Sequence, residues 1–107
     1  MEKTIIVDID GTISFEAPDG NHHNSTPRPE WVDEINRLYD AGYKIIYWSA
    51  RGTVTKKDWT ELTKKQFDEW GVKYHEFILY KPYYTYWIDD RALNPACSEC
   101  KKRISQL

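Results

Sequence analysis

The sequence predicts a single α/β domain in which helices pack on a parallel β-sheet. Short β-branched and aromatic runs alternate with stretches of helical periodicity, an order typical of this fold class. The chain has 107 residues, the length of one domain with one modest core. Polar residues suited to chemistry follow the ends of the apolar runs, where open α/β sheets bind their ligands. We expect right-handed crossovers between the strands.

Composition and periodicity mark the first strand and the first helix. Thr4-Ile5-Ile6-Val7 is a β-branched run of strand length. The loop that follows, residues 14–28, is rich in Pro, Gly, Asn and Ser. In the first helix the apolar residues recur on one face, with Pro29 at its start and Gly42 just past its end.

The second half of the chain alternates in the same way. Ile45-Ile46-Tyr47 gives the second strand a continuous apolar run, and two similar short runs follow later. The second helix opens at Thr55, whose spacing to Asp58 resembles a capping box, and it ends at Gly71. From Leu93 onward we expect a short helix or an irregular tail. The predicted elements are strands over residues 4–9, 43–48, 76–80 and 85–89 and helices over 29–41 and 55–70.

Composition and charge argue against several classes of function. The net charge of −2 gives no general surface for polyanions, although a local basic site stays open. No apolar stretch is long enough to cross a bilayer, and Ile5-Ile6-Val7 is too short for a signal peptide, so we expect a cytoplasmic protein without membrane contact. Cys97 and Cys100 form one C-x-x-C pair, at most half of a zinc site and otherwise two free thiols.

The segment Asp8-Ile9-Asp10-Gly11-Thr12 follows the first strand directly. Gly11 lets the chain turn, so two carboxylates stand at the carboxyl end of the strand. Two acids this close are unfavourable unless a cation or a proton holds them, which predicts a metal site, a catalytic role or both. The simpler interpretation is a strand that ends in a polar turn.

Each of the other predicted strands also ends in a polar group. Ser49 follows the second, Lys81 the third, and Asp89-Asp90 ends the fourth. Because parallel strands share one rim, we expect these residues to gather there. Carboxylates, a lysine and a small hydroxyl suit phosphoryl transfer: carboxylates can hold Mg²⁺ or attack phosphorus, and lysine offsets the charge.

These four motifs, in this order, resemble those of the haloacid dehalogenase (HAD) superfamily of aspartate-nucleophile phosphatases. The resemblance spans about residues 4–92, nearly the whole chain. It implies a three-layer Rossmann-like HAD core with a parallel sheet in the strand order 3-2-1-4 and a site between strands one and four. Neither gap between the motifs has room for the cap domain that many members carry, so the expected domain, residues 1–107, is capless.

The resemblance also implies the catalytic residues. Asp8 would attack phosphorus and form an aspartyl-phosphate. Asp10 would protonate the leaving group and then deprotonate the water that hydrolyses the intermediate. Lys81 would orient Asp8 and offset its charge.

The same resemblance implies how metal and phosphate are held. Mg²⁺ would bind the Asp8 carboxylate, the Asp10 main-chain carbonyl and Asp89, with Asp90 a ligand or acting through a bound water. The phosphoryl group would bind Ser49 and the Ala50 amide, and Thr12 would support the turn of the first motif.

The substrate is less well defined by the sequence. An open, capless site suits a bulky or macromolecular phosphoester, or a lid supplied by a second subunit in a homo-oligomer. Arg51 closely follows Ser49 and is our candidate for binding a second anionic group of the substrate. In the 14–28 loop, His22, His23 and Arg28 are weaker candidates, because a solvated loop explains them equally well.

Two subfamilies and two other classes remain as alternatives. Small capless phosphatases of capsule or surface-sugar biosynthesis share the Lys-Pro and Ile-Asp-Asp-Arg pattern, which favours a sugar phosphate. Phosphatase domains of phage polynucleotide kinases share Ser-x-Arg, which would make the chain a 3′-phosphatase; the acidic net charge disfavours nucleic acid mildly. A non-catalytic Mg²⁺- or phosphate-binding module is the alternative of another class. A signalling receiver domain has its acid pair and its acceptor in the opposite order.

Overall fold

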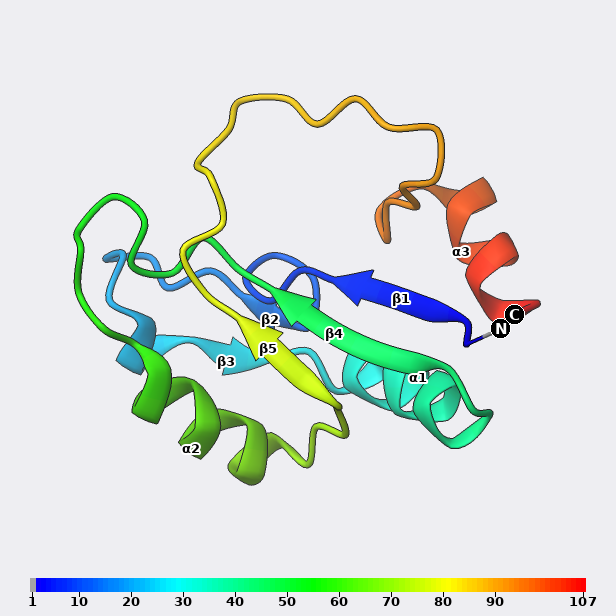
Figure 1. The fold of residues 1–107 in the computed structure, drawn as a ribbon, viewed down its shortest axis with the longest axis horizontal. Helices are drawn as coiled ribbons and strands as arrows, with labels where there is room; N and C mark the ends of the chain where they lie inside the picture. Colours follow the sequence, from blue (N-terminus) through cyan, green and yellow to red (C-terminus); the bar gives the residue numbers. More distant parts are fainter. Residues whose placement is uncertain (1) are drawn as a thin grey trace.

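Three parallel strands form the central sheet of the computed structural model, which describes residues 2–107 (Figure 1). They are β1 (Thr4–Val7), β4 (Lys44–Trp48) and β5 (Glu76–Ile78), in the order β1-β4-β5. Ile5 pairs with Ile45 across the first interface, and Trp48 pairs with Ile78 across the second. The prediction of an α/β fold with a parallel sheet is confirmed.

The 14–28 loop contains secondary structure of its own. β2 (Ser14–Phe15) pairs antiparallel with β3 (Thr26–Pro27), and the 3₁₀ helix η1 (His22–Asn24) lies between them. The side chain of Asn21 caps η1 by accepting a hydrogen bond from the His23 amide at 3.1 Å. The loop is therefore a folded part of the domain.

Helix α1 (Pro29–Asp40) ends one residue earlier than predicted and begins at the predicted proline. Its buried face carries Trp31, Val32, Ile35 and Leu38. Periodicity and end signals agree here, so the prediction is confirmed.

Helix α2 (Thr60–Trp70) begins five residues later than predicted. Lys56 has a φ of 64°, a left-handed conformation that no helix starting at Thr55 could contain. Asp58 instead accepts hydrogen bonds from the amide and hydroxyl of Thr60, at 2.9 and 2.6 Å, and so marks the true start. The end at Gly71, which has a φ of 71°, is as predicted.

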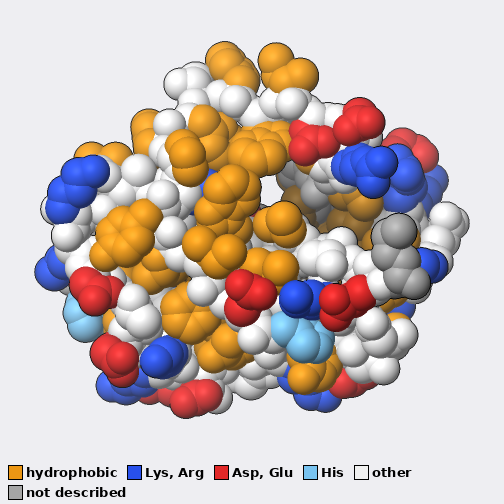
Figure 2. Space-filling model, in the orientation of Figure 1, with side chains coloured by type: hydrophobic (Ala, Val, Ile, Leu, Met, Phe, Trp, Pro, Cys, Tyr) orange, Lys and Arg blue, Asp and Glu red, His pale blue; other side chains and the backbone are white. Residues whose placement is uncertain are grey.

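The core lies between the sheet and the two longer helices. Ile45 and Tyr47 of β4 are fully buried and belong to one cluster with Leu38 of α1 and Phe67 of α2. Ile46 and Trp48 alternate with them and are only partly buried. On that opposite face Ile6 is 61% exposed, and hydrophobic side chains gather there in the space-filling view (Figure 2). One face of the sheet is therefore packed and the other is largely open.

The predicted fourth strand, residues 85–89, is not formed. These residues lie in an exposed segment, 82–92, that contains no strand or helix (Figure 1). Ile88 is 98% exposed. A β-branched and aromatic run becomes a strand only when a neighbouring strand pairs with it, and among residues 2–107 β1 pairs with β4 alone. The four-stranded order 3-2-1-4 is accordingly absent from this structure.

Helix α3 (Ser98–Ser105) lies near the end of the chain. Of the two predicted forms of this region, a short helix and an irregular tail, the structure has the short helix. Arg37 of α1 donates hydrogen bonds to the main-chain carbonyls of Ile104 and Leu107, each at 3.1 Å, which attaches α3 to α1. Cys97 and Cys100 are free thiols at its start. Within residues 2–107, no helix has the length and apolar character needed to span a membrane.

Candidate functional site

A tight turn follows β1 and presents Asp8 and Asp10. Gly11 has a φ of 89°, a region that glycine enters without strain, and its amide donates to the Ser14 carbonyl at 2.8 Å. The amides of Thr12 and Ile13 both donate to the carbonyl of Ile9, whose side chain is fully buried. These bonds fix the turn, so the two carboxylates have defined positions.

Lys81 lies beside Asp8, although 73 positions separate the two residues in the sequence. Its Nζ lies 3.3 Å from Asp8 Oδ1, and the lysine is only 6% exposed. The loop after β4 holds Lys81 in place. The Lys81 amide donates to the Ser49 carbonyl at 2.9 Å, and the Lys81 carbonyl accepts from the Thr53 hydroxyl at 2.5 Å. The predicted meeting of these two residues therefore occurs in the structure.

Asp8 keeps one side open to solvent, since its side chain is 38% exposed. Burial raises the pKa of Asp8, and the charge and hydrogen bond of Lys81 act against that rise. Thr12 Oγ1 lies 3.5 Å from Asp8 Oδ2, at the limit of a hydrogen bond, consistent with the supporting role predicted for it. An exposed carboxylate oxygen beside a lysine is able to meet an incoming electrophile.

Asp10 is held by Arg51 in a bidentate pair. Arg51 Nε donates to Asp10 Oδ2 at 2.9 Å and Nη2 donates to Oδ1 at 3.0 Å. Burial alone would raise the pKa of Asp10, but the hydrogen bonds and charge of Arg51 bring the pKa below its usual value. Ser14 adds a third hydrogen bond, at 3.2 Å. The pair with Arg51 therefore fixes the direction in which the Asp10 carboxyl group points.

The side chain of Arg51 is fully buried, and this changes its expected role. Its Nη1 donates to Thr63 Oγ1 at 3.0 Å and to Gln66 Oε1 at 2.6 Å, so the guanidinium is engaged on both sides. A group without exposed atoms does not reach a substrate. In this structure Arg51 orients Asp10 and joins it to α2, and binding of an anionic substrate group by Arg51 stays a prediction.

Ser49 and Ala50 lie at the carboxyl end of β4, as predicted. Ser49 is 2% exposed, and its Oγ accepts a hydrogen bond from the Arg51 amide at 3.1 Å. Ala50 is partly exposed. The hydroxyl thus shapes the turn that aims Arg51 at Asp10, while binding of phosphate by these residues stays a prediction.

Asp89 and Asp90 are not brought to the other two acids. Asp89 accepts hydrogen bonds from the Trp87 indole at 3.2 Å and from the Arg91 amide at 2.7 Å, both inside the exposed segment. Across residues 2–107, no group of three or more His, Cys, Asp or Glu side chains could hold a metal ion. The predicted metal set of four acids is therefore split in this structure.

The donors that remain beside Asp8 do not make a magnesium site by themselves. Both carboxylate oxygens of Asp10 are committed to Arg51, which leaves its main-chain carbonyl and the open side of Asp8. These are hard oxygen donors of the kind Mg²⁺ takes, but without Asp89 or Asp90 the site has a single free carboxylate. The residues in this arrangement therefore do not fit the ion.

Three further residues belong to the site. His22 Nδ1 lies 3.6 Å from Asp10 Oδ2. The His22 ring packs edge-on against the Trp59 ring, with 4.9 Å between the ring centroids. Burial lowers the pKa of His22. Thr63 and Gln66 were missed because a single helical face that mixes polar and apolar residues resembles ordinary packing. The available signal was their spacing, since they share the buried face of α2 with Phe67.

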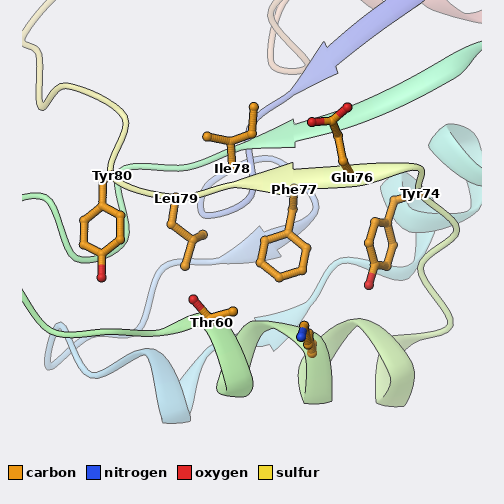
Figure 3. Close-up of a pocket in the computed structure, with 8 residues that line it drawn as sticks. Thr60, Tyr74, Glu76, Phe77, Ile78, Leu79 and Tyr80 are labelled. Atoms are coloured by element: carbon orange, nitrogen blue, oxygen red, sulfur yellow. The ribbon is translucent and has the colours of Figure 1, made fainter.

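A groove lies elsewhere on the domain, away from the two aspartates. It has a volume of about 600 Å³ and runs between α2 and the outer edge of β5 (Figure 3). Tyr74, Phe77 and Leu79 point toward α2 there, while Ile78 points away (Figure 3). Neither Asp8 nor Asp10 lines it. The candidate site is therefore identified by the ion pairs Lys81–Asp8 and Arg51–Asp10, and this groove is not part of it.

Comparison with known proteins supports the fold. No protein-family model matches the chain, and no curated protein matches it. It is similar to a crystal structure of a target protein from Vibrio cholerae, for which no activity is named. The TM-score is 0.80 at 24% identity, over 97% of this chain and 98% of that one. A likeness at this identity concerns the fold alone.

Proposed function

We propose that the protein is a Mg²⁺-dependent phosphomonoester hydrolase of the HAD type that works through an aspartyl-phosphate. The observation that carries the proposal is the contact of 3.3 Å between Lys81 Nζ and Asp8 Oδ1, beside a second carboxylate with a cation of its own. A nucleophile needs an open oxygen and an acid–base group needs a fixed direction, and the two aspartates differ in this way.

Each step of the proposed reaction uses these residues. Asp8 attacks phosphorus, the bond from phosphorus to the leaving oxygen breaks, and that oxygen takes a proton from Asp10, which enters this step in its protonated form. Water then attacks the phosphorus of the aspartyl-phosphate and gives a proton back to Asp10. This hydrolysis releases phosphate and restores Asp8. Lys81 offsets negative charge during both steps, and Ser49 with the Ala50 amide binds the phosphoryl oxygens.

The proposed Mg²⁺ requires Asp89 or Asp90 beside Asp8. We propose that residues 85–89 reach that place by pairing with the free edge of β1, which would complete the HAD core with its strand order 3-2-1-4. The exposed segment has the composition of a strand, and in the described part of the chain one edge of β1 is unpaired. Bound there, the ion would offset charge on the phosphoryl group.

The proposed substrate is a sugar phosphate or another bulky phosphoester, hydrolysed in the cytoplasm by a single capless domain. Between β1 and β4 there are only the 14–28 loop and α1, which leaves the site open to large substrates. A polynucleotide 3′-phosphatase is the second candidate, favoured by Ser49-Ala50-Arg51, although Arg51 here binds Asp10. A homo-oligomer could supply a lid.

Hydrolysis of p-nitrophenyl phosphate, with and without Mg²⁺, tests the proposal. We expect turnover that needs Mg²⁺, is abolished by Asp8→Asn, and falls by about 10²- to 10⁴-fold in Asp10→Asn, because hydrolysis of the aspartyl-phosphate loses the base that activates water. Glu69→Gln, on the exposed side of α2, is the control. A folded protein that neither hydrolyses phosphoesters nor binds Mg²⁺ would instead be a binding module. Sugar phosphates and 3′-phosphorylated oligonucleotides then separate the two substrate classes.

A further inference from the structure

Gln66 of α2 connects two parts of the site that the sequence separates. It is 4% exposed. Its Oε1 accepts from Arg51 Nη1 at 2.6 Å, and its Nε2 donates to the main-chain carbonyl of His22 at 2.6 Å. One side chain therefore joins the cation that holds Asp10 to the 3₁₀ turn of the 14–28 loop.

The turn that Gln66 holds also lies against Asp10. His22 Nδ1 lies 3.6 Å from Asp10 Oδ2, and the ring packs on the buried Trp59. The His22 carbonyl accepts a second hydrogen bond, from the Ser25 amide at 3.2 Å, which closes the turn. Moving this turn would change what Asp10 faces.

We infer that Gln66 is a positioning residue that couples the His22–Asn24 turn to Asp10 through Arg51, so that the acid faces the leaving group. This inference rests on the proposed function. Arg51 is also held by Thr63, so loss of Gln66 does not break the ion pair with Asp10, but it removes one of the two helix acceptors that fix the guanidinium and it releases the turn. Misplacing a catalytic group by about 1 Å can cost about 10²-fold in rate, so a contact outside the reacting atoms can still act on the chemistry.

The expected signature depends on the leaving group. Departing p-nitrophenolate is a weak base and needs little help from an acid, whereas phenolate is a stronger base and depends on protonation. A misdirected Asp10 therefore harms phenyl phosphate far more than p-nitrophenyl phosphate. A residue that only holds the fold together would reduce both to the same extent, through the amount of folded enzyme.

Two substitutions separate the two hydrogen bonds of Gln66. Gln66→Met keeps the approximate volume and removes both. Gln66→Glu keeps an acceptor for Arg51 but removes the donor to the His22 carbonyl. Glu69→Met, one turn further along α2 and facing solvent, is the matched control.

The experiment compares kcat/KM for the two aryl phosphates, because this ratio covers the steps up to departure of the leaving group. We expect both Gln66 variants to lose about tenfold on phenyl phosphate and less than about twofold on p-nitrophenyl phosphate, and the control to match the parent. Equal losses on both esters, or a Gln66→Glu variant that matches the parent, would overturn the inference.

Hydrogen exchange provides a second readout that needs no turnover. The amides of His23, Asn24 and Ser25 are hydrogen-bonded within the turn, and we expect them to exchange faster in both Gln66 variants. Unchanged exchange would show that the turn does not depend on Gln66. If instead the parent lacks activity that depends on Asp8, the proposed function fails, and the exchange result still decides the coupling.

Discussion

Asp10 and Asp89 are both carboxylates of the candidate site, but the chain holds them by different means. Asp10 is tied by Arg51 to two polar residues of a buried helix face, at distances of 2.6 to 3.0 Å. Asp89 accepts hydrogen bonds from Trp87 and Arg91, each two residues away in the chain, in a segment where every residue is exposed. One half of the site is thus organised by packing, and the other half depends on something that the described residues do not supply.

The difference shows what a buried network contributes. Arg51 is surrounded by acceptors, so any rotation would leave a buried donor unsatisfied, which is costly. The exposed segment is instead restrained by aromatic contacts, of Trp87 with Trp48 and of Tyr84 with Lys81, and Tyr86 and Ile88 are 84% and 98% exposed. A catalytic acid needs the first kind of support, whereas metal ligands can be gathered by the metal itself.

The largest expected effect comes from breaking the buried half. Arg51→Leu leaves Asp10 and Gln66 without their shared cation, and we expect a loss of about 3 kcal/mol in the free energy of unfolding. Arg91→Leu removes the same type of side chain from the exposed segment and should stay within about 0.5 kcal/mol of the parent. Urea unfolding of the three proteins measures both. Similar losses in the two variants would contradict the comparison.

The same contrast explains which parts of the fold the sequence predicts. The α1 helix depends on a local pattern, an apolar face between Pro29 and Gly42, and that pattern was sufficient. The start of α2 depends on a left-handed Lys56, which no spacing rule indicates. The strand expected over residues 85–89 depends on a partner far away in the chain, so its own composition was insufficient.

In the candidate site, too, one contact was predictable from the sequence and another was not. Motif order predicted that Lys81 would meet Asp8, because strand ends in a parallel sheet share one rim. The role of Arg51 could not be read from its position, since burial depends on α2, which contributes Thr63 and Gln66. A buried arginine needs several acceptors, and sequence alone does not show which residues supply them.

A smaller effect is expected from the ion that the exposed half would bind. If Asp89 and Asp90 join Asp8 around Mg²⁺, the ion stabilises the folded protein by about 1.4 kcal/mol at ten times its dissociation constant. Thermal unfolding should show this gain in the parent and not in Asp89→Asn/Asp90→Asn. Without Mg²⁺ the two proteins should unfold alike, because both acids are exposed and the hydrogen bonds of Asp89 stay within its own segment. A gain that survives the double substitution would place the ion elsewhere.

The smallest expected effect on stability is also the sharpest test of the exposed segment. Tyr86→Pro removes a main-chain donor from a residue that lies in no strand and is 84% exposed, so without Mg²⁺ we expect a change within about 0.5 kcal/mol. If residues 85–89 pair with β1 when the site is complete, the same proline removes a ladder hydrogen bond or restricts that pairing. Stabilisation by Mg²⁺ and turnover should then both fall, while Tyr86→Ala retains them. A proline variant that behaves like Tyr86→Ala with the ion present would show that Asp89 and Asp90 reach Asp8 without a fourth strand. A large loss without the ion would show that the segment is already paired, and the two halves of the site would then be equally organised.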